Sequence, residues 1–274
     1  MNLYGLIGHP LGHSFSQAYF TEKFAREKIN ACYENFDLKS LSEIRQLLNQ
    51  YPDLKGFNIT IPYKEAIITY LDDIDETAKE IGAVNTVKVL PKGRFKGYNT
   101  DVIGLEATLT LIVRGTSKGT LATPEGGYVV PVRYLTKLSP ALVLGTGGAS
   151  KAVQYVLKKH GINFHLVSRD PEKGHFTYQN LTPEVIKNHL LIINATPVGM
   201  APNIDDAPVI PYEALTSEHV LFDLIYNPEE TLFLKNGKAF GTKNINGLTM
   251  LHAQAEASWE IIADSSLLLS ESAC

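Results

Sequence analysis

The chain has 274 residues and a mass of 30.2 kDa, which exceeds the usual size of one domain and favours two. Hydrophobic residues make up 44% and charged residues 20%, which excludes a disordered or collagen-like chain. The formal net charge of -4 provides no basic surface to neutralise a phosphate backbone, so we expect no nucleic-acid partner.

The two cysteines, Cys32 and Cys274, provide neither a disulfide framework nor a cysteine cluster for a metal, so we expect no metal and a reducing, cytoplasmic environment. The first eight residues lack the basic start of a secretory signal. No apolar run reaches the length of about 18 residues that spans a bilayer. We therefore expect neither export nor a membrane anchor.

Short apolar segments alternate with amphipathic ones over the first hundred residues, which is typical of a layered α/β domain. The expected elements are strand 3–7, helix 16–28, strand 32–36, helix 41–50 and strand 55–59. Residues 60–62 predict a helix start with Pro62 in its first turn, continued over 64–71. Segments 83–90 and 94–97 resemble a hairpin around Pro91-Lys92-Gly93.

The stretch 113–140 is rich in glycine and proline, which indicates a surface excursion or short hairpin at a domain junction. After it the pattern has βαβ spacing, with strand 141–144, helix 150–160 and strands 163–167, 190–193 and 220–224. A final amphipathic helix, 247–262, is expected to pack back onto the first domain. We predict one domain from 1–102 plus 247–274 and a second from 103–246.

A glycine turn lies directly between the strand 141–144 and the following helix. Gly145 and Gly147 permit a tight turn and the close approach of a pyrophosphate, which would sit on the helix N-terminus. Ser150 takes the place of the third glycine of this fingerprint, and a plain turn can have a similar sequence. The expected cofactor residues here are Gly145, Thr146, Gly147, Gly148 and Ala149.

The residues after strand 163–167 lie where the adenosine ribose of a bound dinucleotide would be placed. Ser168, Arg169 and Lys173 can surround a 2′-phosphate, which favours NADP over NAD. Alternatively the cations are ordinary surface groups, and Asp170 accepts a ribose hydroxyl and permits NAD. After strand 190–193, small polar residues are expected to line the cofactor, namely Ala195, Thr196, Pro197, Gly199 and Met200.

Four polar motifs in the first domain have no obvious structural need: GHPLGHSFS at 8–16, GFNITIPYK at 56–64, GAVNT at 82–86 and GYNTD at 97–101. Each by itself can be a turn or a helix cap. In this order, with the glycine turn and the motifs NATPVGM at 194–200, DLIYNP at 223–228 and GLTMLHAQ at 247–254, they resemble the shikimate dehydrogenase family over nearly the whole chain.

The resemblance implies a two-domain α/β fold, with an N-terminal substrate-binding domain, a Rossmann-type NADP-binding domain and a C-terminal helix that returns to the first domain. It implies reversible reduction of 3-dehydroshikimate to shikimate with NADPH, in a monomer or homodimer. Lys64 and Asp101 match the catalytic pair, in which the lysine can protonate the carbonyl oxygen and the aspartate can orient the lysine and the reacting hydroxyl. The sequence leaves open which of the two transfers the proton. The matching substrate residues are Ser14, Ser16, Thr60, Asn85, Tyr226 and Gln254, and Leu224 and Gly247 match cofactor positions.

Two features depart from the family pattern. Gln17 stands where many relatives have proline, and the connector 113–140 is longer than usual. Three alternatives remain open at this point: a quinate or quinate/shikimate dehydrogenase using NAD, a methyltransferase with a similar glycine loop, and a non-catalytic ligand sensor on the same scaffold. The serine pair at 14 and 16 favours shikimate over quinate.

Overall fold

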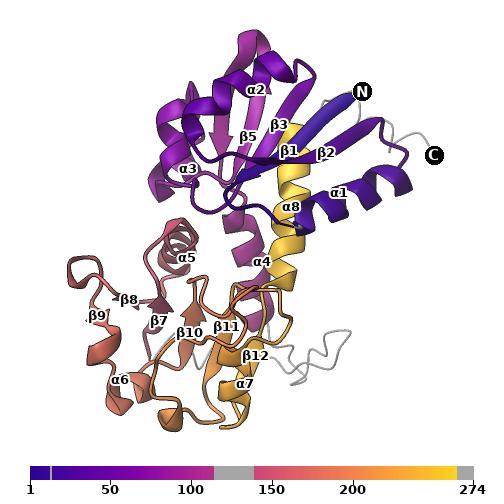
Figure 1. Ribbon diagram of the computed structural model, residues 1–274. Coiled ribbons are helices and arrows are strands. Elements are labelled where there is room, and N and C mark those ends of the chain that lie inside the picture. The colour runs from indigo at the N-terminus through magenta and orange to yellow at the C-terminus, as the bar shows by residue number, and fades with distance from the viewer. Residues whose placement is uncertain (13, 114–138, 264–274) are drawn as a thin grey trace. The chain divides into compact units, whose positions relative to one another are not determined.

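The computed structural model describes residues 1–12, 14–113 and 139–263 of the chain (Figure 1). It divides into two compact units. Unit 1 comprises Met1–Thr100 together with the chain from Gln254 onward, and unit 2 comprises Asp101–Ala253. No helix among the described residues is long and apolar enough to cross a membrane.

Unit 1 is built on a mixed sheet with the strand order β2-β1-β3-β5-β6-β4. Strand β1 pairs in parallel with β2 and β3, whereas β5 is antiparallel to both β3 and β6. The elements before β5 are β1 (Asn2–Gly8), α1 (Phe15–Arg26), β2 (Ala31–Asp37), η1 (Leu41–Glu43), α2 (Ile44–Gln50), β3 (Leu54–Ile59), η2 (Ala66–Tyr70), β4 (Asp73–Ile74) and α3 (Glu76–Ile81). The hairpin follows, with β5 (Thr86–Leu90), η3 (Pro91–Gly93) and β6 (Arg94–Tyr98).

A hydrophobic core covers each face of the unit 1 sheet. Alternate residues of a strand point to opposite faces, so a single strand contributes to both cores. Leu3 and Ile7 of β1 belong to the core on one face, and Tyr4 and Leu6 to the core on the other. Helix α8 (Leu248–Ile262) contributes Trp259 to this second core. Figure 1 shows the end of α8 near α1, close to β1 and β2, which confirms that the C-terminal helix returns to the first domain.

Unit 2 is a sheet of parallel strands in the order β12-β11-β10-β7-β8-β9, which is the Rossmann arrangement. Its strands are β7 (Ala141–Leu144), β8 (Phe164–Ser168), β9 (Phe176–Thr177), β10 (Leu191–Asn194), β11 (Val220–Asp223) and β12 (Lys243–Ile245). Its helices include α4 (Asp101–Val113), α5 (Gly148–Lys159), α6 (Pro183–Lys187) and α7 (Leu232–Lys238). Strands β7, β10 and β11 are wholly buried, as expected for parallel strands covered on both faces.

The helix predicted over residues 60–71 is wrong for most of its length. The Tyr63 amide donates to the Thr60 carbonyl in a turn, and only η2 is helical, as a 3-10 helix. The Lys64 carbonyl accepts a hydrogen bond of 2.7 Å from the amide of Val84, so it is used in tertiary pairing with the segment that leads into β5. The local pattern that predicted a helix contains no sign of this distant partner.

The other predicted strands and helices are confirmed, with ends that differ by up to three residues. Helices α3, α6 and α7, which are short, and also α4 were not predicted from the sequence. The predicted excursion over 113–140 starts at the last residue of α4, and most of it, 114–138, lies outside the described residues.

Candidate active site

The strand order of unit 2 marks one edge of its sheet as a ligand site. The chain runs from β7 outward through β8 and β9, then returns to β10 on the other side of β7 and continues to β11 and β12. Ligands of such sheets bind outside the carboxyl ends of the strands at the point where this order reverses. That point lies between the ends of β7 and β10, at Leu144 and Asn194.

The glycine turn after β7 occupies this point. Gly145 has φ +103°, and a Cβ there would lie 2.9 Å from Cγ2 of Thr196, so both the backbone and the packing require glycine. A Cβ on Gly147 would meet no atom within 4 Å, which leaves the turn open on its outer side. Gly147 also precedes α5 without a side-chain cap, so an anion can take the place of the missing cap.

Ser150, which takes the place of the third glycine in the dinucleotide-binding fingerprint, has a structural role in the turn. Its side chain is buried, and its hydroxyl donates a 2.7 Å hydrogen bond to the carbonyl of Gly145. Gln154 in turn donates to the Ser150 hydroxyl at 3.2 Å. The serine therefore closes the turn from inside the helix and leaves the outer side of the turn unobstructed.

The charged residues after β8 differ in whether they are already engaged within the protein. Asp170 accepts a hydrogen bond from the amide of Glu172 and forms an ion pair of 3.4 Å with Lys173. Arg169 is exposed and forms no hydrogen bond or ion pair with the described residues. Arg169 is therefore available to a 2′-phosphate, whereas the Asp170 carboxylate, which would favour NAD, is already engaged.

Asn194 and Asp223 hold the ends of β10 and β11 together, although neither was expected from the sequence to have an individual role. Asn194 is fully buried, donates to Asp223 at 3.0 Å, and accepts from the amide and hydroxyl of Thr196. Asp223 also accepts from Thr231 at 2.6 Å and from the amide of Ile225. Burial raises the pKa of Asp223 to about 6, even though these hydrogen bonds favour its charged form. The network fixes the start of the loop that carries residues 195–200.

Leu224 and Gly247, both expected at the cofactor, are adjacent. A Cβ on Gly247 would lie 2.1 Å from the Leu224 carbonyl oxygen, and the Gly247 amide donates to the carbonyl of Ile225 at 3.0 Å. The turn into α8 is therefore pressed against the end of β11. The open glycine turn, the uncapped helix and the exposed arginine together fit a dinucleotide with a 2′-phosphate.

In unit 1, the serine pair lies at the start of α1. Ser14 caps the helix by accepting from the Gln17 amide at 3.2 Å, and its hydroxyl donates to Oδ1 of Asn35 at 2.7 Å. Asn35 is held in this orientation because its amide group donates to Oε1 of Gln17 at 3.0 Å. The Ser14 hydrogen must therefore turn away from Asn35 before it can bind a substrate carboxylate.

Asn85 and Gln254 are brought together although they are 169 positions apart in the chain. Nδ2 of Asn85 donates to Gln254 at 3.4 Å and to the hydroxyl of Thr100 at 3.0 Å, and its Oδ1 accepts from the Thr100 amide at 2.7 Å. Only 2% of Asn85 is exposed. Lys64 is half-buried, and its main-chain carbonyl accepts a hydrogen bond from the amide of Val84, the residue before Asn85.

The expected site residues are divided between the two units. Unit 1 holds Ser14, Ser16, Thr60, Lys64, Asn85 and Gln254. Unit 2 holds Asp101, Tyr226 and the whole expected cofactor set. Asp101 is buried, begins α4 and directly follows Thr100, which Asn85 holds in unit 1.

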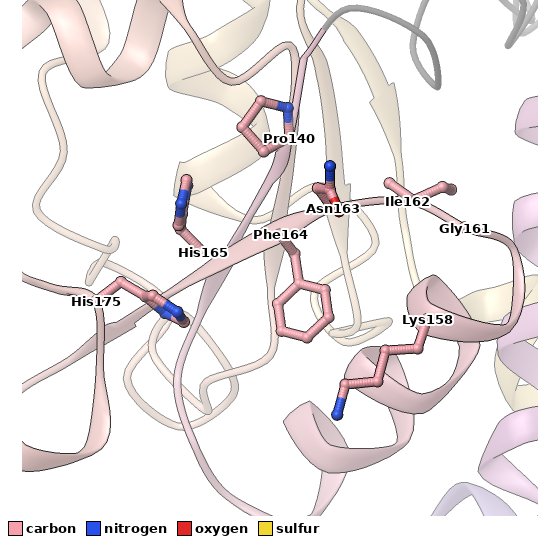
Figure 2. Close-up of a pocket in the computed structure, with 8 residues that line it drawn as sticks. All are labelled: Pro140, Lys158, Gly161, Ile162, Asn163, Phe164, His165 and His175. Atoms are coloured by element: carbon pink, nitrogen blue, oxygen red, sulfur yellow. The ribbon is translucent and has the colours of Figure 1, made fainter.

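A separate hollow on unit 2 lies away from these groups. Figure 2 shows this pocket of about 580 Å³, lined by Pro140, Lys158, Gly161, Ile162, Asn163, Phe164, His165 and His175. Pro140 and Asn163 directly precede β7 and β8, so the pocket lies toward the amino ends of the parallel strands. The residues expected to bind the dinucleotide lie at the opposite, carboxyl ends of the strands, so this pocket is separate from the candidate site.

Known proteins resemble the chain over its whole length. A family model described as the shikimate dehydrogenase substrate binding domain matches residues 6–87. Shikimate dehydrogenase (NADP(+)) of Methanococcus maripaludis strain C7 is 38% identical to this chain over an alignment of 275 residues. The match covers 94% of this chain and 90% of that protein.

Two solved structures share the fold. Shikimate 5-dehydrogenase from Thermus thermophilus, in complex with NADP(H) and shikimate, has a TM-score of 0.76 at 30% identity, with 100% of both chains covered. Quinate dehydrogenase from Corynebacterium glutamicum, in complex with NAD, has a TM-score of 0.75 at 27% identity and covers 100% of this chain and 99% of its own. With the Methanococcus maripaludis relative at 38% identity over 90% of its length, these findings show that the chain belongs to the shikimate dehydrogenase family.

Proposed function

We propose that this chain catalyses the reversible reduction of 3-dehydroshikimate to shikimate with NADPH, a step of chorismate and aromatic amino-acid biosynthesis. The observation that carries the proposal is the open glycine turn at a Rossmann switch point in unit 2, together with the hydrogen bond that joins Asn85 to Gln254 in unit 1. The relative of known structure binds NADP(H) and shikimate and is covered over its full length.

The two units would divide the work. Unit 1 binds the substrate, which is supported by the match of residues 6–87 to a substrate binding domain. Unit 2 binds NADP at the ends of β7, β8, β10 and β11, where the turn at Gly145 would receive the pyrophosphate and Arg169 the 2′-phosphate. When bound, the nicotinamide supplies the hydride that reduces the carbonyl carbon.

Lys64 and Asp101 would manage the proton. As an ammonium, Lys64 polarises the substrate carbonyl and can give a proton to its oxygen; as a free amine it can take the alcohol proton in the reverse direction. Asp101 is buried at the start of α4, where it would orient the lysine and the reacting hydroxyl. Both residues act on the same oxygen, so loss of either should reduce turnover more than binding.

The remaining polar residues would hold the ring. Ser14 and Ser16 bind the carboxylate through hydroxyl donors, which suit an anion without burying a cation. The ring hydroxyls would be bound by Thr60, Asn85, Asp101, Tyr226 and Gln254. A site composed of hydrogen-bonding groups rejects analogues that lack a hydroxyl, because its own polar groups are then left unpaired.

Steady-state oxidation of shikimate and of quinate, each with NADP and with NAD, tests this function. We expect the highest kcat/KM for shikimate with NADP, because Arg169 is exposed and the Asp170 carboxylate is engaged. A preference for quinate with NAD would instead assign the chain the activity named for the Corynebacterium glutamicum relative. Absence of turnover in a folded protein would move the assignment to a ligand-binding role.

We also propose that the protein works in the cytoplasm as a monomer or homodimer. Cys32, the free cysteine found among the described residues, is half-buried and fits a reducing environment. Size-exclusion chromatography with light scattering would decide between the two assemblies.

A further inference from the structure

The loop that leads to the serine pair is held by a carboxylate of the neighbouring strand. Strand β1 is followed by residues 9–12 and then by Ser14, which caps α1; we call residues 9–12 together with Ser14 the serine loop. At the end of β2, Oδ1 of Asp37 lies 2.6 Å from Nδ1 of His9, and its Oδ2 accepts a hydrogen bond of 3.3 Å from the amide of Leu11. One side chain of β2 therefore contacts the serine loop at two positions.

The chemistry of Asp37 shows what these two contacts do. An ionised carboxylate only accepts hydrogen bonds, so Nδ1 of His9 carries the hydrogen of the 2.6 Å contact. The Leu11 amide belongs to the main chain, so the second bond fixes the backbone of the loop. The side chains of His9 and Asp37 are 38% and 44% exposed, so water screens the attraction between their charges. The effect of Asp37 on the loop is therefore mainly one of geometry.

The start of the serine loop is fixed by main-chain hydrogen bonds to both sides. The His9 amide donates to the carbonyl of Ile61, just beyond the end of β3, at 3.2 Å. On the other side, the Leu38 amide donates at 3.2 Å to the carbonyl of Gly8, the last residue of β1. The Asp37 carboxylate extends this support farther along the loop, toward the residues that would meet the substrate.

The far end of the serine loop is held by Asn35, which shares a face of β2 with Asp37 because alternate residues of a strand point to the same side. Nδ2 of Asn35 donates to the carbonyl of Gly12 at 3.4 Å, and its Oδ1 accepts from the Ser14 hydroxyl at 2.7 Å. The Ser14 hydrogen has to leave Asn35 when it turns to a substrate carboxylate, whereas neither partner of Asp37 is expected to bind the substrate. Asp37 can therefore hold the loop both before and after binding.

We propose that Asp37 is a positioning residue that holds the serine loop, and with it the Ser14 hydroxyl, where the substrate carboxylate binds. The inference rests on the proposed function of the site. Asp37 need not touch the substrate, because it acts through His9 and Leu11. A loop that is already held in one conformation loses less conformational freedom when the substrate arrives, so the contribution of Asp37 is to substrate affinity.

The test is Asp37→Ala, made in the wild-type protein and in a Ser14→Ala variant. In the wild-type background we expect the KM for shikimate to rise about five- to tenfold, because two hydrogen bonds that order the loop are lost. We expect kcat to change by less than about twofold and the KM for NADP to stay constant, because neither the proposed proton donor nor the glycine turn is altered. In the Ser14→Ala background the same substitution should change the KM for shikimate by less than about twofold, because the group it positions is gone.

Asp37→Asn separates geometry from charge. The asparagine carbonyl can accept from the Leu11 amide, and its NH2 group can donate to Nδ1 of His9 once that ring carries its hydrogen on Nε2. The KM for shikimate should therefore stay within about twofold of the wild-type value. An Asp37→Asn variant as impaired as Asp37→Ala, or additive effects of Asp37→Ala and Ser14→Ala, would overturn the positioning role.

Asp72→Ala is the matched control within unit 1. Asp72 also accepts from a main-chain amide, that of Phe95 at 2.7 Å, and from a side-chain nitrogen, that of Arg45 at 2.9 Å. It directly precedes β4, which lies at the opposite edge of the sheet from β2. Equal effects of Asp72→Ala and Asp37→Ala on the KM for shikimate would overturn the inference. If Asp37→Ala does not fold, His9→Ala removes one of its two hydrogen bonds, and it must raise the KM for shikimate but not for NADP.

Shikimate binding measured by calorimetry, with no turnover required, distinguishes failure of the positioning role from failure of the proposed function. A wild-type protein that binds no shikimate would overturn both. A wild-type protein that binds and oxidises shikimate, with an Asp37→Ala variant that binds it equally well, would overturn the positioning role alone.

Discussion

Replacing Arg169 by alanine tests the cofactor assignment, because this side chain is exposed and forms no hydrogen bond or ion pair with the described residues. Although its charge acts on the nearby Tyr178, no such bond is lost with it, so its removal should leave the melting temperature within about 2 °C. A charge-assisted hydrogen bond to a phosphate contributes about 1.5–3 kcal/mol. The KM for NADP should therefore rise by a factor of about 10 to 150, while the KM for NAD stays unchanged.

Lys173→Ala is the internal comparison for this experiment. Lys173 is 67% exposed and already pairs with Asp170 at 3.4 Å, so its loss should raise the KM for NADP less than the loss of Arg169 does. It also releases the Asp170 carboxylate, which should improve the use of NAD. The assay is steady-state oxidation of saturating shikimate, followed by the absorbance of the reduced cofactor. Equal changes in KM for NADP and NAD in Arg169→Ala would refute a 2′-phosphate contact.

Three further predictions concern the reaction and the scaffold. Lys64→Ala should lower kcat by about 10²- to 10⁴-fold with shikimate binding largely retained, and an unchanged kcat would remove the lysine from the mechanism. Gly247→Ala should destabilise the protein by about 1–3 kcal/mol and raise the KM for NADP, since a Cβ would lie 2.1 Å from a carbonyl oxygen; a variant with the wild-type melting temperature would contradict this. Burial raises the pKa of Asp223 from 3.8 to about 6, so the folded state holds this proton more tightly than the unfolded state. The free energy of unfolding therefore falls by about 3 kcal/mol as pH rises from about 3 to about 7. In urea unfolding, Asp223→Asn should gain about 1.4 kcal/mol relative to wild type between about pH 5 and about pH 7.5, and parallel pH profiles would show that the carboxyl is not the cause.

The alternating apolar segments and the glycine turn predicted much of the fold without any structure. The segments around β7, β8, β10 and β11 are short apolar runs, and the turn at Gly145 lies directly between β7 and α5, so local pattern was sufficient to identify them. The order of the motifs along the chain also identified the family. These are properties of residues close together in sequence.

Contacts between distant segments decided what the sequence left open. The Lys64 carbonyl accepts a hydrogen bond from the amide of Val84, where the predicted helix would have required a partner four residues along the chain. Asn194 meets Asp223 across neighbouring strands. Asp37, which was not predicted to have a role, meets the serine loop only because β2 lies beside β1. An isolated aspartate at the end of a strand has no local feature that distinguishes it from any other polar strand residue. Its partner is determined by strand order and register, which depend on how the whole sheet buries its two faces.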